Sequence, residues 1–203
     1  LKQAVQSVLD QTYPHCEAVI SQDHGSAGLD AEVAAWSRSL AAENSRVRYS
    51  ANARPMGLAG NWNASVAAAS AEYVMLIGDD DRVLPEGIAS LAEALSPRAD
   101  IVFGNHYLID HEGRRLEVES VQWTRRYGRD TLPPGLQLDA EKAVWNNSVP
   151  ICAALIRREL LLKNRFNEAL NTPEIELFLR LARAGAAFQF TPAYVSEYRI
   201  HPA

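Results

Sequence analysis

The chain has 203 residues, of which 22% are charged, and a formal net charge of -5. This length accommodates one well-packed domain. The acidic balance argues against a nucleic-acid-binding surface, which needs clustered positive charge. No stretch approaches the roughly 20 consecutive apolar residues of a membrane span. The composition is therefore typical of a single soluble globular domain.

The two cysteines, Cys16 and Cys152, lie far apart and lack metal-ligand spacing. They favour reduced thiols in a cytosolic setting, and they are also compatible with a single long-range disulfide. The sequence begins directly in a helix-like pattern and shows no signal peptide.

The first half is predicted to alternate helices with strands, since its apolar residues switch between helical and strand-like spacing. We expect helices at 1–11, 30–42, 57–69 and 88–95, and strands at 17–21, 47–50, 73–78 and 101–104. Alternation of this kind indicates βαβ units. The predicted fold class is therefore α/β, with a mostly parallel sheet flanked by helices.

The second half has a less regular pattern. We expect a small β-ribbon over 105–121 around a turn at 110–113, because Gly113 suits a positive φ. Residues 122–138 show no clear period and are interpreted as an irregular loop that could cover a cleft. A helix at 139–146, a strand at 151–156 and helices at 158–163 and 173–184 complete the prediction.

Three consecutive carboxylates, Asp79, Asp80 and Asp81, follow the apolar run 73–78. Adjacent like charges repel unless a cation lies between them. Their position at the carboxyl end of a predicted buried strand is where open α/β sheets bind ligands. We interpret them as a divalent-metal or ligand site; the alternative is an acidic turn before the helix that Pro85 opens.

The helix predicted at 173–184 begins with Pro173 and ends before Gly185. Glu174 lies on its apolar stripe and in its first turn, where the helix dipole favours the ionised carboxylate that a proton acceptor needs. Glu176, in contrast, precedes Arg180 by four residues, the spacing of a solvated ion pair. The alternative for Glu174 is a helix-start carboxylate that only complements the dipole.

Taken together, these segments resemble the family 2 glycosyltransferases with the GT-A fold, which transfer sugars from nucleotide diphosphate donors with inversion at the anomeric carbon. Each motif alone is weak, whereas their order and spacing together are specific. The motifs are 7–14, the Asn-rich segment with Asn52, Gly57, Asn61 and Asn63, the acidic residues 78–81 with Pro85, the helix 173–181, and the closing segment 198–202.

The resemblance implies roles for individual residues. Asp80 is expected to ligate Mg²⁺ or Mn²⁺ bridging the donor diphosphate, and His201 could reach the metal or the diphosphate. Asp79 would approach the ribose or the metal's water shell, with Asp81 assisting either role. Asp23 would bind the nucleotide sugar; an Asx-turn is its alternative. The alternative for His201 is a solvated surface histidine near the chain end, without a ligand role.

The sequence departs from the family pattern at several points. Glu174, expected to be the catalytic base, stands where the family usually has Asp, and Pro173 replaces the preceding acid. The extra methylene shifts the carboxylate by about a bond length. His24 leaves the assignment of Asp23 uncertain by one position. The family's first strand has no counterpart before Leu1, so we expect the natural protein to extend upstream.

The leading hypothesis is an inverting, metal-assisted glycosyltransferase. Residues 1–104 would form the nucleotide-sugar-binding half of one GT-A-like domain covering 1–203, and 105–203 the acceptor and catalytic half. The acceptor would be a saccharide, a lipid-linked molecule or another hydroxyl compound, and the protein cytoplasmic or peripheral to the inner face of a membrane. A nucleotide-sugar-binding module without transferase activity is the alternative. A nucleotidyltransferase would need a glycine-rich basic phosphate loop, which the sequence lacks.

Overall fold

The computed structural model describes residues 1–25 and 27–201, so Ser26 of the loop after the first predicted strand and Pro202 of the closing motif lie outside the described residues. The helices are α1 (Lys2–Leu9), α2 (Ala27–Glu43), α3 (Gly57–Ala68), α4 (Gly87–Ala94), α5 (Glu117–Arg126), α6 (Ala140–Trp145), the 3₁₀ turn η1 (Ile151–Ala153), α7 (Arg158–Asn164) and α8 (Pro173–Arg183). The strands are β1 (Ala18–Gln22), β2 (Val47–Ala51), β3 (Tyr73–Val74), β4 (Arg82–Val83), β5 (Ile101–Ile109), β6 (Gly135–Leu136), β7 (Ala154–Arg157) and β8 (Phe188–Arg199).

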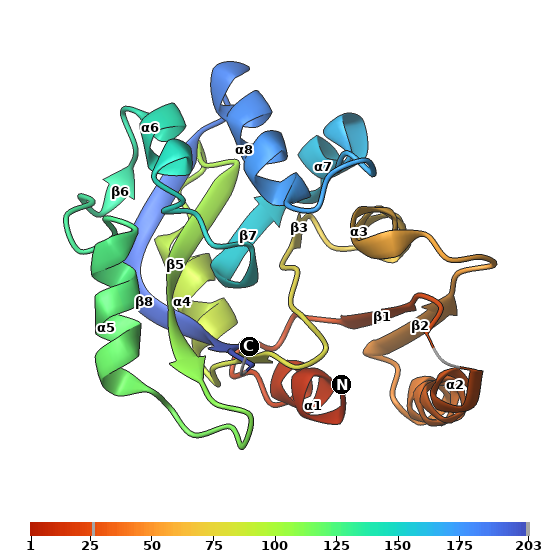
Figure 1. Ribbon diagram of the computed structural model, residues 1–203. Helices are drawn as coiled ribbons and strands as arrows, with labels where there is room; N and C mark the ends of the chain where they lie inside the picture. The colour runs from red at the N-terminus through yellow and green to blue at the C-terminus, as the bar shows by residue number, and fades with distance from the viewer. Residues whose placement is uncertain (26, 202–203) are drawn as a thin grey trace.

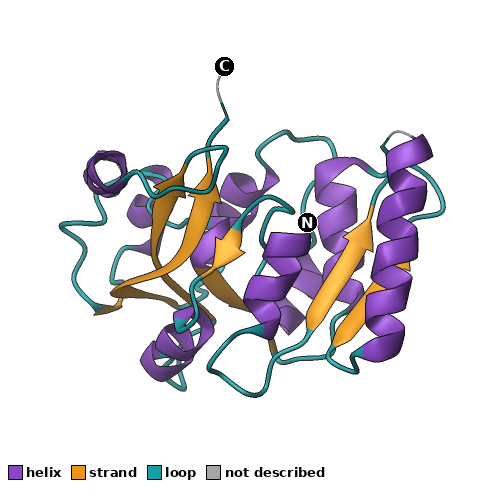
Figure 2. Ribbon diagram, turned by 90° about the horizontal axis from the view of Figure 1, so that it is seen from below, coloured by secondary structure: helices purple, strands orange, loops and turns teal. Residues whose placement is uncertain are grey.

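The strands of the described residues form two sheets with helices packed around them (Figures 1 and 2). A six-stranded sheet has the order β3-β7-β5-β8-β4, with β6 on β8, while β1 and β2 pair with each other. The α/β class is confirmed, but the larger sheet is mixed: β5 and β8 are parallel, and its other pairs are antiparallel. The long segments that lead into β7 and β8 permit either strand direction, so alternation alone could not predict it.

The main core lies between the larger sheet and α8. Phe103 of β5 and Phe188 of β8 are fully buried, and Phe178 of α8 packs edge-on against Phe188 with ring centroids 6.0 Å apart. Burying one such ring stabilises the fold by about 1.5–3 kcal/mol. In Figure 1, α8 lies across the upper part of this sheet. This packing fixes the helix that carries Glu174.

The predicted strand 73–78 is shorter than expected. Only Tyr73 and Val74 pair, with Arg157 and Ile156 of β7. Within the described residues, 75–78 have no ladder partner, and β1 pairs only with β2. An apolar run becomes a strand only where a neighbour accepts its backbone hydrogen bonds, so hydrophobicity alone overestimated this element.

The predicted β-ribbon at 105–121 is wrong beyond its turn. β5 continues to Ile109, a single bridge joins Ile109 to Arg115, and α5 then begins at Glu117. The loop predicted over 122–138 therefore begins inside a helix. The buried face of α5 carries the hydroxyl residues Ser120 and Thr124, so the helix has no apolar period to detect.

A buried ion cluster joins β8 to β4 and to the segment before α5. The carboxylate of Glu197, which is only 6% exposed, lies 2.7 Å from Nε of Arg82 and 2.6 Å from Nε of Arg115. Arg82 also donates to the carbonyl oxygen of Gly113 at 2.8 Å. The cluster therefore holds the strand that follows the three aspartates against β8.

Replacing Glu197 with glutamine is expected to lower the free energy of unfolding by about 2–3 kcal/mol, because two arginines lose their buried counter-charge. The loss falls below that of a fully buried pair, since both arginines keep contact with water. Urea unfolding followed by circular dichroism measures it. The matched control is Glu112→Gln, which removes an exposed partner of Arg114 and should change stability by about 0.5 kcal/mol or less. Equal losses in the two variants would contradict the prediction.

Candidate active site

The three aspartates form a tight turn between β3 and β4, and they differ in environment. Asp79 is exposed, Asp80 is partly exposed and Asp81 is buried at 3% exposure. A Cβ on Gly78 would lie 2.7 Å from Oδ1 of Asp80 and 3.1 Å from Oδ2 of Asp81. Glycine at this position therefore leaves room for the two carboxylates, and a Cβ there would push the carboxylate of Asp80 aside.

Asp81 holds the turn against β8. Its Oδ1 accepts a hydrogen bond from the backbone N–H of Arg199 at 2.9 Å, and its Oδ2 accepts one from the N–H of Gly78 at 3.3 Å. Burial raises the pKa of Asp81 to about 6; the N–H of Arg199 opposes this rise, and the charge of Asp80 adds to it. The adjacent carboxylates of Asp80 and Asp81 thus repel each other, and an added cation would reduce this repulsion.

The structure brings His201 to Asp80. Nε2 of His201 lies 2.7 Å from Oδ2 of Asp80, although 121 positions separate the two residues in sequence. This contact places the predicted pair of metal ligands side by side. The side chain of His201 is exposed, as expected of a histidine near the chain end, but it also contacts Asp80.

Arg199 is a site residue to which the sequence analysis gave no role. Its guanidinium donates to the carbonyl oxygens of Asp80 at 2.8 Å and Asp110 at 2.8 Å, and to Oε1 of Gln3 at 3.1 Å. It thereby ties the aspartate turn to β5, α1 and the end of β8. The available signal was an arginine two residues before His201 in the closing motif.

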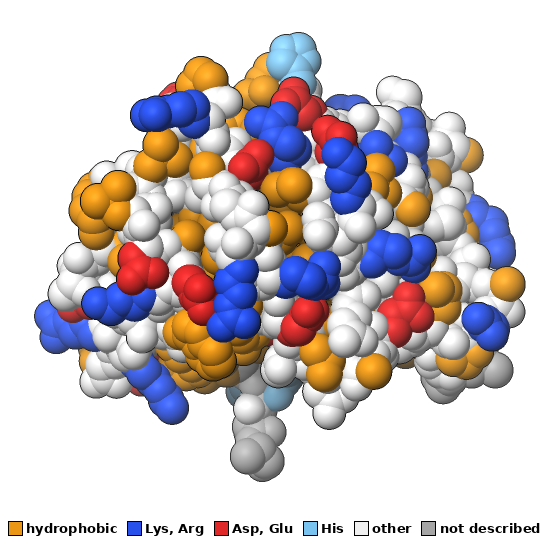
Figure 3. All heavy atoms as spheres, turned by 90° about the horizontal axis from the view of Figure 1, so that it is seen from above, with side chains coloured by type: hydrophobic (Ala, Val, Ile, Leu, Met, Phe, Trp, Pro, Cys, Tyr) orange, Lys and Arg blue, Asp and Glu red, His pale blue; other side chains and the backbone are white. Residues whose placement is uncertain are grey.

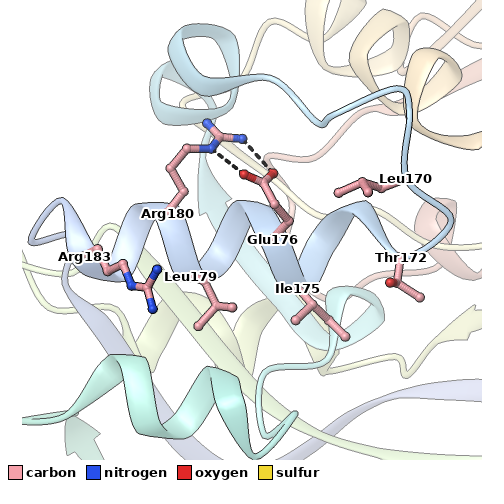
Figure 4. A pocket seen from close by; sticks show the side chains of 7 residues that line it. All are labelled: Leu170, Thr172, Ile175, Glu176, Leu179, Arg180 and Arg183. Atoms are coloured by element: carbon pink, nitrogen blue, oxygen red, sulfur yellow. Dashed lines mark hydrogen bonds and ion pairs between the residues drawn. The ribbon is translucent and has the colours of Figure 1, made fainter.

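Glu174 lies in the first turn of α8, as predicted, and its side chain is partly buried. Among the described residues it has no ion-pair partner. Burial raises its pKa, and a hydrogen bond from its own backbone N–H partly offsets the rise. Glu176 instead forms the predicted pair with Arg180 at 2.9 Å, on the outer side of the helix (Figure 4). Of these two acidic residues, Glu174 is the one that is free to accept a proton.

The pKa of Tyr198, on β8, depends on the charges of both Glu174 and the aspartate turn. Its pKa is raised first by burial, and then by the charges of Asp81, Cys152, Asp80 and Glu174. One hydroxyl group therefore feels the carboxylates from the aspartate turn and from the start of α8. The charges of the predicted base and of the predicted metal ligand therefore both act on this tyrosine.

Asp23 shapes the loop before α3. Its carboxylate accepts hydrogen bonds from the backbone N–H of Met56 at 3.0 Å and of Gly57 at 2.8 Å, and from Nδ2 of Asn52 at 3.1 Å. Burial opposes its ionisation, but the bonds from Asn52, Met56 and Gly57 outweigh it and lower the pKa. The contacts are those of a long-range helix cap rather than of a local Asx-turn.

The Asn-rich segment provides structural bonds around this loop. Nδ2 of Asn52 also donates to Oδ1 of Asn61 at 3.0 Å, and Oγ of Ser21 donates to the same oxygen at 2.7 Å. Asn63 bonds in both directions with the backbone of Phe166, at 2.9 and 3.0 Å. These amides attach α3 to the end of β1 and to the segment before α8.

A hollow of about 230 Å³ lies at the carboxyl ends of β1 and β2. Ligands of open α/β sheets bind at such strand ends. It is lined by Gln22, Asp23, His24, Asp30, Ala31, Ala34, Arg38, Tyr49, Ala51 and Asn52. Asp23 is the predicted site residue that borders it.

A second hollow, of about 500 Å³, lies on the outer side of α8 and is bordered by none of the predicted site residues. Figure 4 shows Leu170 and Thr172 at one end and Arg183 at the other. Arg180 is held there by Glu176 and by the carbonyl oxygen of Asn164 at 2.6 Å. Seen from above, acidic and basic side chains are interspersed on the surface (Figure 3). The described residues on this side therefore form no large patch of a single charge.

Two searches of the described part of the chain bear on ligands and membranes. It contains no group of three or more His, Cys, Asp or Glu side chains placed to hold a metal ion. None of its helices combines the length and apolar character needed to cross a bilayer. Cys16 and Cys152 are both free thiols.

The fold is that of the GT-A glycosyltransferases, as expected. TarS from S. aureus in complex with UDP-GlcNAc superposes with a TM-score of 0.71 over 100% of this chain and 55% of that one, at 16% identity. The mannosyltransferase PcManGT from Pyrobaculum calidifontis, in complex with GDP-Man and Mn²⁺, gives a TM-score of 0.67 over 97% of this chain and 52% of that one, also at 16% identity. These likenesses concern the fold.

The model of the family "Glycosyl transferase family 2" matches residues 1–164, and the chain belongs to this family. It is 25% identical over 186 residues to the GalNAc(5)-diNAcBac-PP-undecaprenol beta-1,3-glucosyltransferase of Campylobacter jejuni, covering 89% of this chain and 55% of that protein. It is 29% identical over 111 residues to glycosyltransferase GlyG of Streptococcus pneumoniae, covering 54% and 36%. The match thus spans about half the length of the first relative and about a third of the second.

Proposed function

We propose that this protein transfers a sugar from a nucleotide diphosphate donor to an acceptor hydroxyl group, with inversion at the anomeric carbon. The observation that carries the proposal is the carboxylate of Glu174, which lies in the first turn of α8 and has no ion-pair partner among the described residues. With Asp80 and Asp81, it contributes to the raised pKa of Tyr198. A proton acceptor and a charged diphosphate site must flank the transferred sugar in such a reaction. Family membership supports the same chemistry.

The donor nucleotide would bind in the hollow at the ends of β1 and β2. Asp23 lies at its edge, and the side chains of Gln22 and Tyr49, which are hydrogen-bonded at 2.7 Å, form part of its lining. Asp79, exposed on the turn between β3 and β4, would approach the ribose or the water around the metal. The complexes of TarS with UDP-GlcNAc and of PcManGT with GDP-Man support a nucleotide-sugar donor.

Asp80 and His201 would hold Mg²⁺ or Mn²⁺, with Asp81 supporting the turn. A carboxylate oxygen and an imidazole nitrogen in contact suit Mn²⁺, and the carboxylate suits either ion. Two protein ligands leave positions for phosphate oxygens and water, as is common at Mg²⁺ sites. When bound, the ion supplies charge that stabilises the departing nucleoside diphosphate. The Mn²⁺ bound to PcManGT supports this assignment.

Glu174 would act as the general base. Its carboxylate takes the proton of the acceptor hydroxyl while that oxygen attacks the anomeric carbon, and the bond from this carbon to the donor phosphate oxygen breaks in the same step. The single displacement inverts the configuration at that carbon. Partial burial supports this role, because a raised pKa strengthens the base. No ion-pair partner among residues 1–25 and 27–201 competes for the carboxylate.

We further propose that the acceptor is a saccharide linked to a polyprenyl diphosphate, by analogy with the printed activity of the Campylobacter relative. Residues 105–147, which include α5 and α6, would bind it. The free cysteines fit a reducing compartment, and a lipid-linked acceptor would place the protein at the inner face of a membrane.

Product analysis tests the proposed function. The protein is incubated with UDP-glucose, UDP-GlcNAc or GDP-mannose, Mn²⁺ or Mg²⁺, and a polyprenyl-diphosphate-linked saccharide, and products are identified by mass spectrometry. We expect a single sugar to be added, with inverted configuration by NMR. Calorimetry with UDP and GDP runs in parallel. Tight nucleotide binding without any product would favour the alternative, a nucleotide-sugar-binding module.

The pH dependence of kcat/KM should show an acid limb set by Glu174. The base works only when deprotonated, and burial raises its pKa, so activity falls with decreasing pH at a higher pH than an exposed glutamate would give. A pH–rate profile measures this limb. Because Asp81 titrates at about 6, the residual activity of Glu174→Gln is the control. An unchanged acid limb in that variant would assign the limb to Asp81 and contradict the prediction.

A further inference from the structure

Tyr198 is exposed on a strand segment that is otherwise buried. Val195, Ser196, Glu197 and Arg199 are each at most 9% exposed, whereas Tyr198 is 41% exposed. Side chains alternate between the two faces of a strand, so Tyr198 points away from the Glu197 ion cluster and from the Arg199 guanidinium. An aromatic residue here presents both a ring and a hydroxyl group to the site.

The backbone around Tyr198 is fixed by contacts with the aspartate turn. The next residue, Arg199, donates its backbone N–H to Asp81 at 2.9 Å, and His201 contacts Asp80 at 2.7 Å. On the other side, β8 is paired with β5 in register Tyr198 to Leu108. Tyr198 is therefore held beside the proposed diphosphate site by the same bonds that form it.

A buried histidine supports the ring from behind. His106 of β5 is 4% exposed, and its ring packs edge-on against Tyr198, with centroids 6.0 Å apart and an interplanar angle of 66°. Burial, with the charge of Arg129 added, lowers the pKa of His106 to about 3. The histidine is therefore a neutral wall at physiological pH, and it restricts the tyrosine ring on its protected side.

The hydroxyl group of Tyr198 is available to a ligand. The hydroxyls of Tyr49, Tyr73 and Tyr194 each form a hydrogen bond with the protein, at 2.7, 3.1 and 3.3 Å. Within the described residues, the hydroxyl of Tyr198 forms none, as is also true of the other three tyrosines of the chain. Burial and the surrounding carboxylates raise its pKa, so it stays protonated and can donate.

The position of this donor indicates what it meets. If the proposed function is correct, the diphosphate lies at Asp80 and the attacking acceptor oxygen at Glu174, and the transferred sugar spans the space between them. Tyr198 directly precedes Arg199, whose backbone N–H binds Asp81. The charges of Asp80 and Glu174 both contribute to the raised pKa of Tyr198. We infer that Tyr198 is a donor-sugar-binding residue, whose phenol O–H donates a hydrogen bond to a hydroxyl oxygen of the transferred sugar while its ring packs against that sugar.

Tyr198→Phe tests the inference, because it removes the hydroxyl and keeps the ring. The nucleotide sugar is the one among UDP-glucose, UDP-GlcNAc and GDP-mannose that binds the wild-type protein most tightly. Calorimetry compares its affinity with that of the bare nucleotide of the same base, UDP or GDP. Loss of one neutral hydrogen bond should weaken binding of the nucleotide sugar about 3–10-fold and leave the bare nucleotide unchanged. Equal weakening of both ligands, or of neither, would overturn the assignment.

The matched control is Tyr194→Phe, the same chemical change on the same strand, where the lost hydroxyl contacts Thr124 instead of facing the site. It should bind both ligands as the wild-type protein does. Tyr198→Ala, whose fold is checked by its thermal unfolding midpoint, should weaken nucleotide-sugar binding more than Tyr198→Phe. A test by binding also separates the two proposals. A wild-type protein that binds a nucleotide sugar but never turns it over would contradict the proposed transferase activity. The Tyr198→Phe comparison would still decide the role of this tyrosine.

Discussion

Glu174→Gln is expected to reduce kcat by about 10²–10⁴-fold and to leave nucleotide affinity unchanged. Glutamine keeps the size and hydrogen-bonding capacity of the side chain but cannot accept the acceptor proton, which is the contribution of a general base. Steady-state kinetics with the donor found active in the product assay measures kcat, and calorimetry with UDP or GDP measures nucleotide affinity. The partial burial of the carboxylate makes a water molecule a poor substitute.

Two further variants sharpen this result. Glu174→Asp restores the residue type that the family usually has but shortens the side chain, so it should retain more activity than Glu174→Gln. Glu176→Gln is the matched control, since Glu176 lies two residues away on the same helix and pairs with Arg180 outside the site. If Glu174→Gln turned over donor as fast as Glu176→Gln, the base would lie elsewhere.

Asp80→Ala is expected to lower kcat/KM by about 10³-fold and to abolish any stimulation by Mn²⁺. The change removes the carboxylate that would hold the ion against the donor diphosphate, and several kcal/mol of transition-state stabilisation with it. It also leaves His201 without its partner at 2.7 Å. Activity measured across a Mn²⁺ titration, together with Mn²⁺ binding by electron paramagnetic resonance, checks both effects.

The three aspartates should respond unequally to alanine substitution. Asp79→Ala is expected to cost less than Asp80→Ala, because Asp79 is exposed and makes no contact with His201. Asp81→Ala should chiefly lower thermal stability, since Asp81 binds the backbone of Arg199 and Gly78. Glu93→Ala, on the exposed side of α4, controls for loss of a carboxylate. Full activity in Asp80→Ala would remove the metal from the proposal.

The helices were well predicted because their signals are local. Pro173 at the first position and a stripe of apolar residues predicted α8, which begins at Pro173 in the structure. α5 was missed because the face it buries carries Ser120 and Thr124, and the hydroxyl of Ser120 bonds the backbone of Leu116 and Leu108. Local pattern finds a helix only where the buried face is apolar.

The candidate site divides in the same way. Glu174 and the three aspartates could be proposed from the sequence because each stands at a boundary of a predicted element: Glu174 in the first turn of a helix, and the aspartates after an apolar run. Arg199 was given no role, since its contacts with Asp80, Asp110 and Gln3 join segments far apart in the chain. The contacts of Asp23 with Met56 and Gly57 likewise needed the folded loop to become visible.

The sequence by itself determined the class of the fold, the family resemblance and the residues that carry charge at the ends of strands and helices. These properties follow from the spacing of apolar residues and from the order of motifs along one chain. Only the tertiary structure decided that His201 contacts Asp80, that Asp81 is buried while Asp79 is not, and that Tyr198 is exposed on a strand whose neighbouring residues are buried. Distance and burial are set by which strands pair, and β8 pairs with β4 and β5, whose residues lie about 90 to 115 positions earlier in the chain. Such long-range pairing leaves no local period in the sequence.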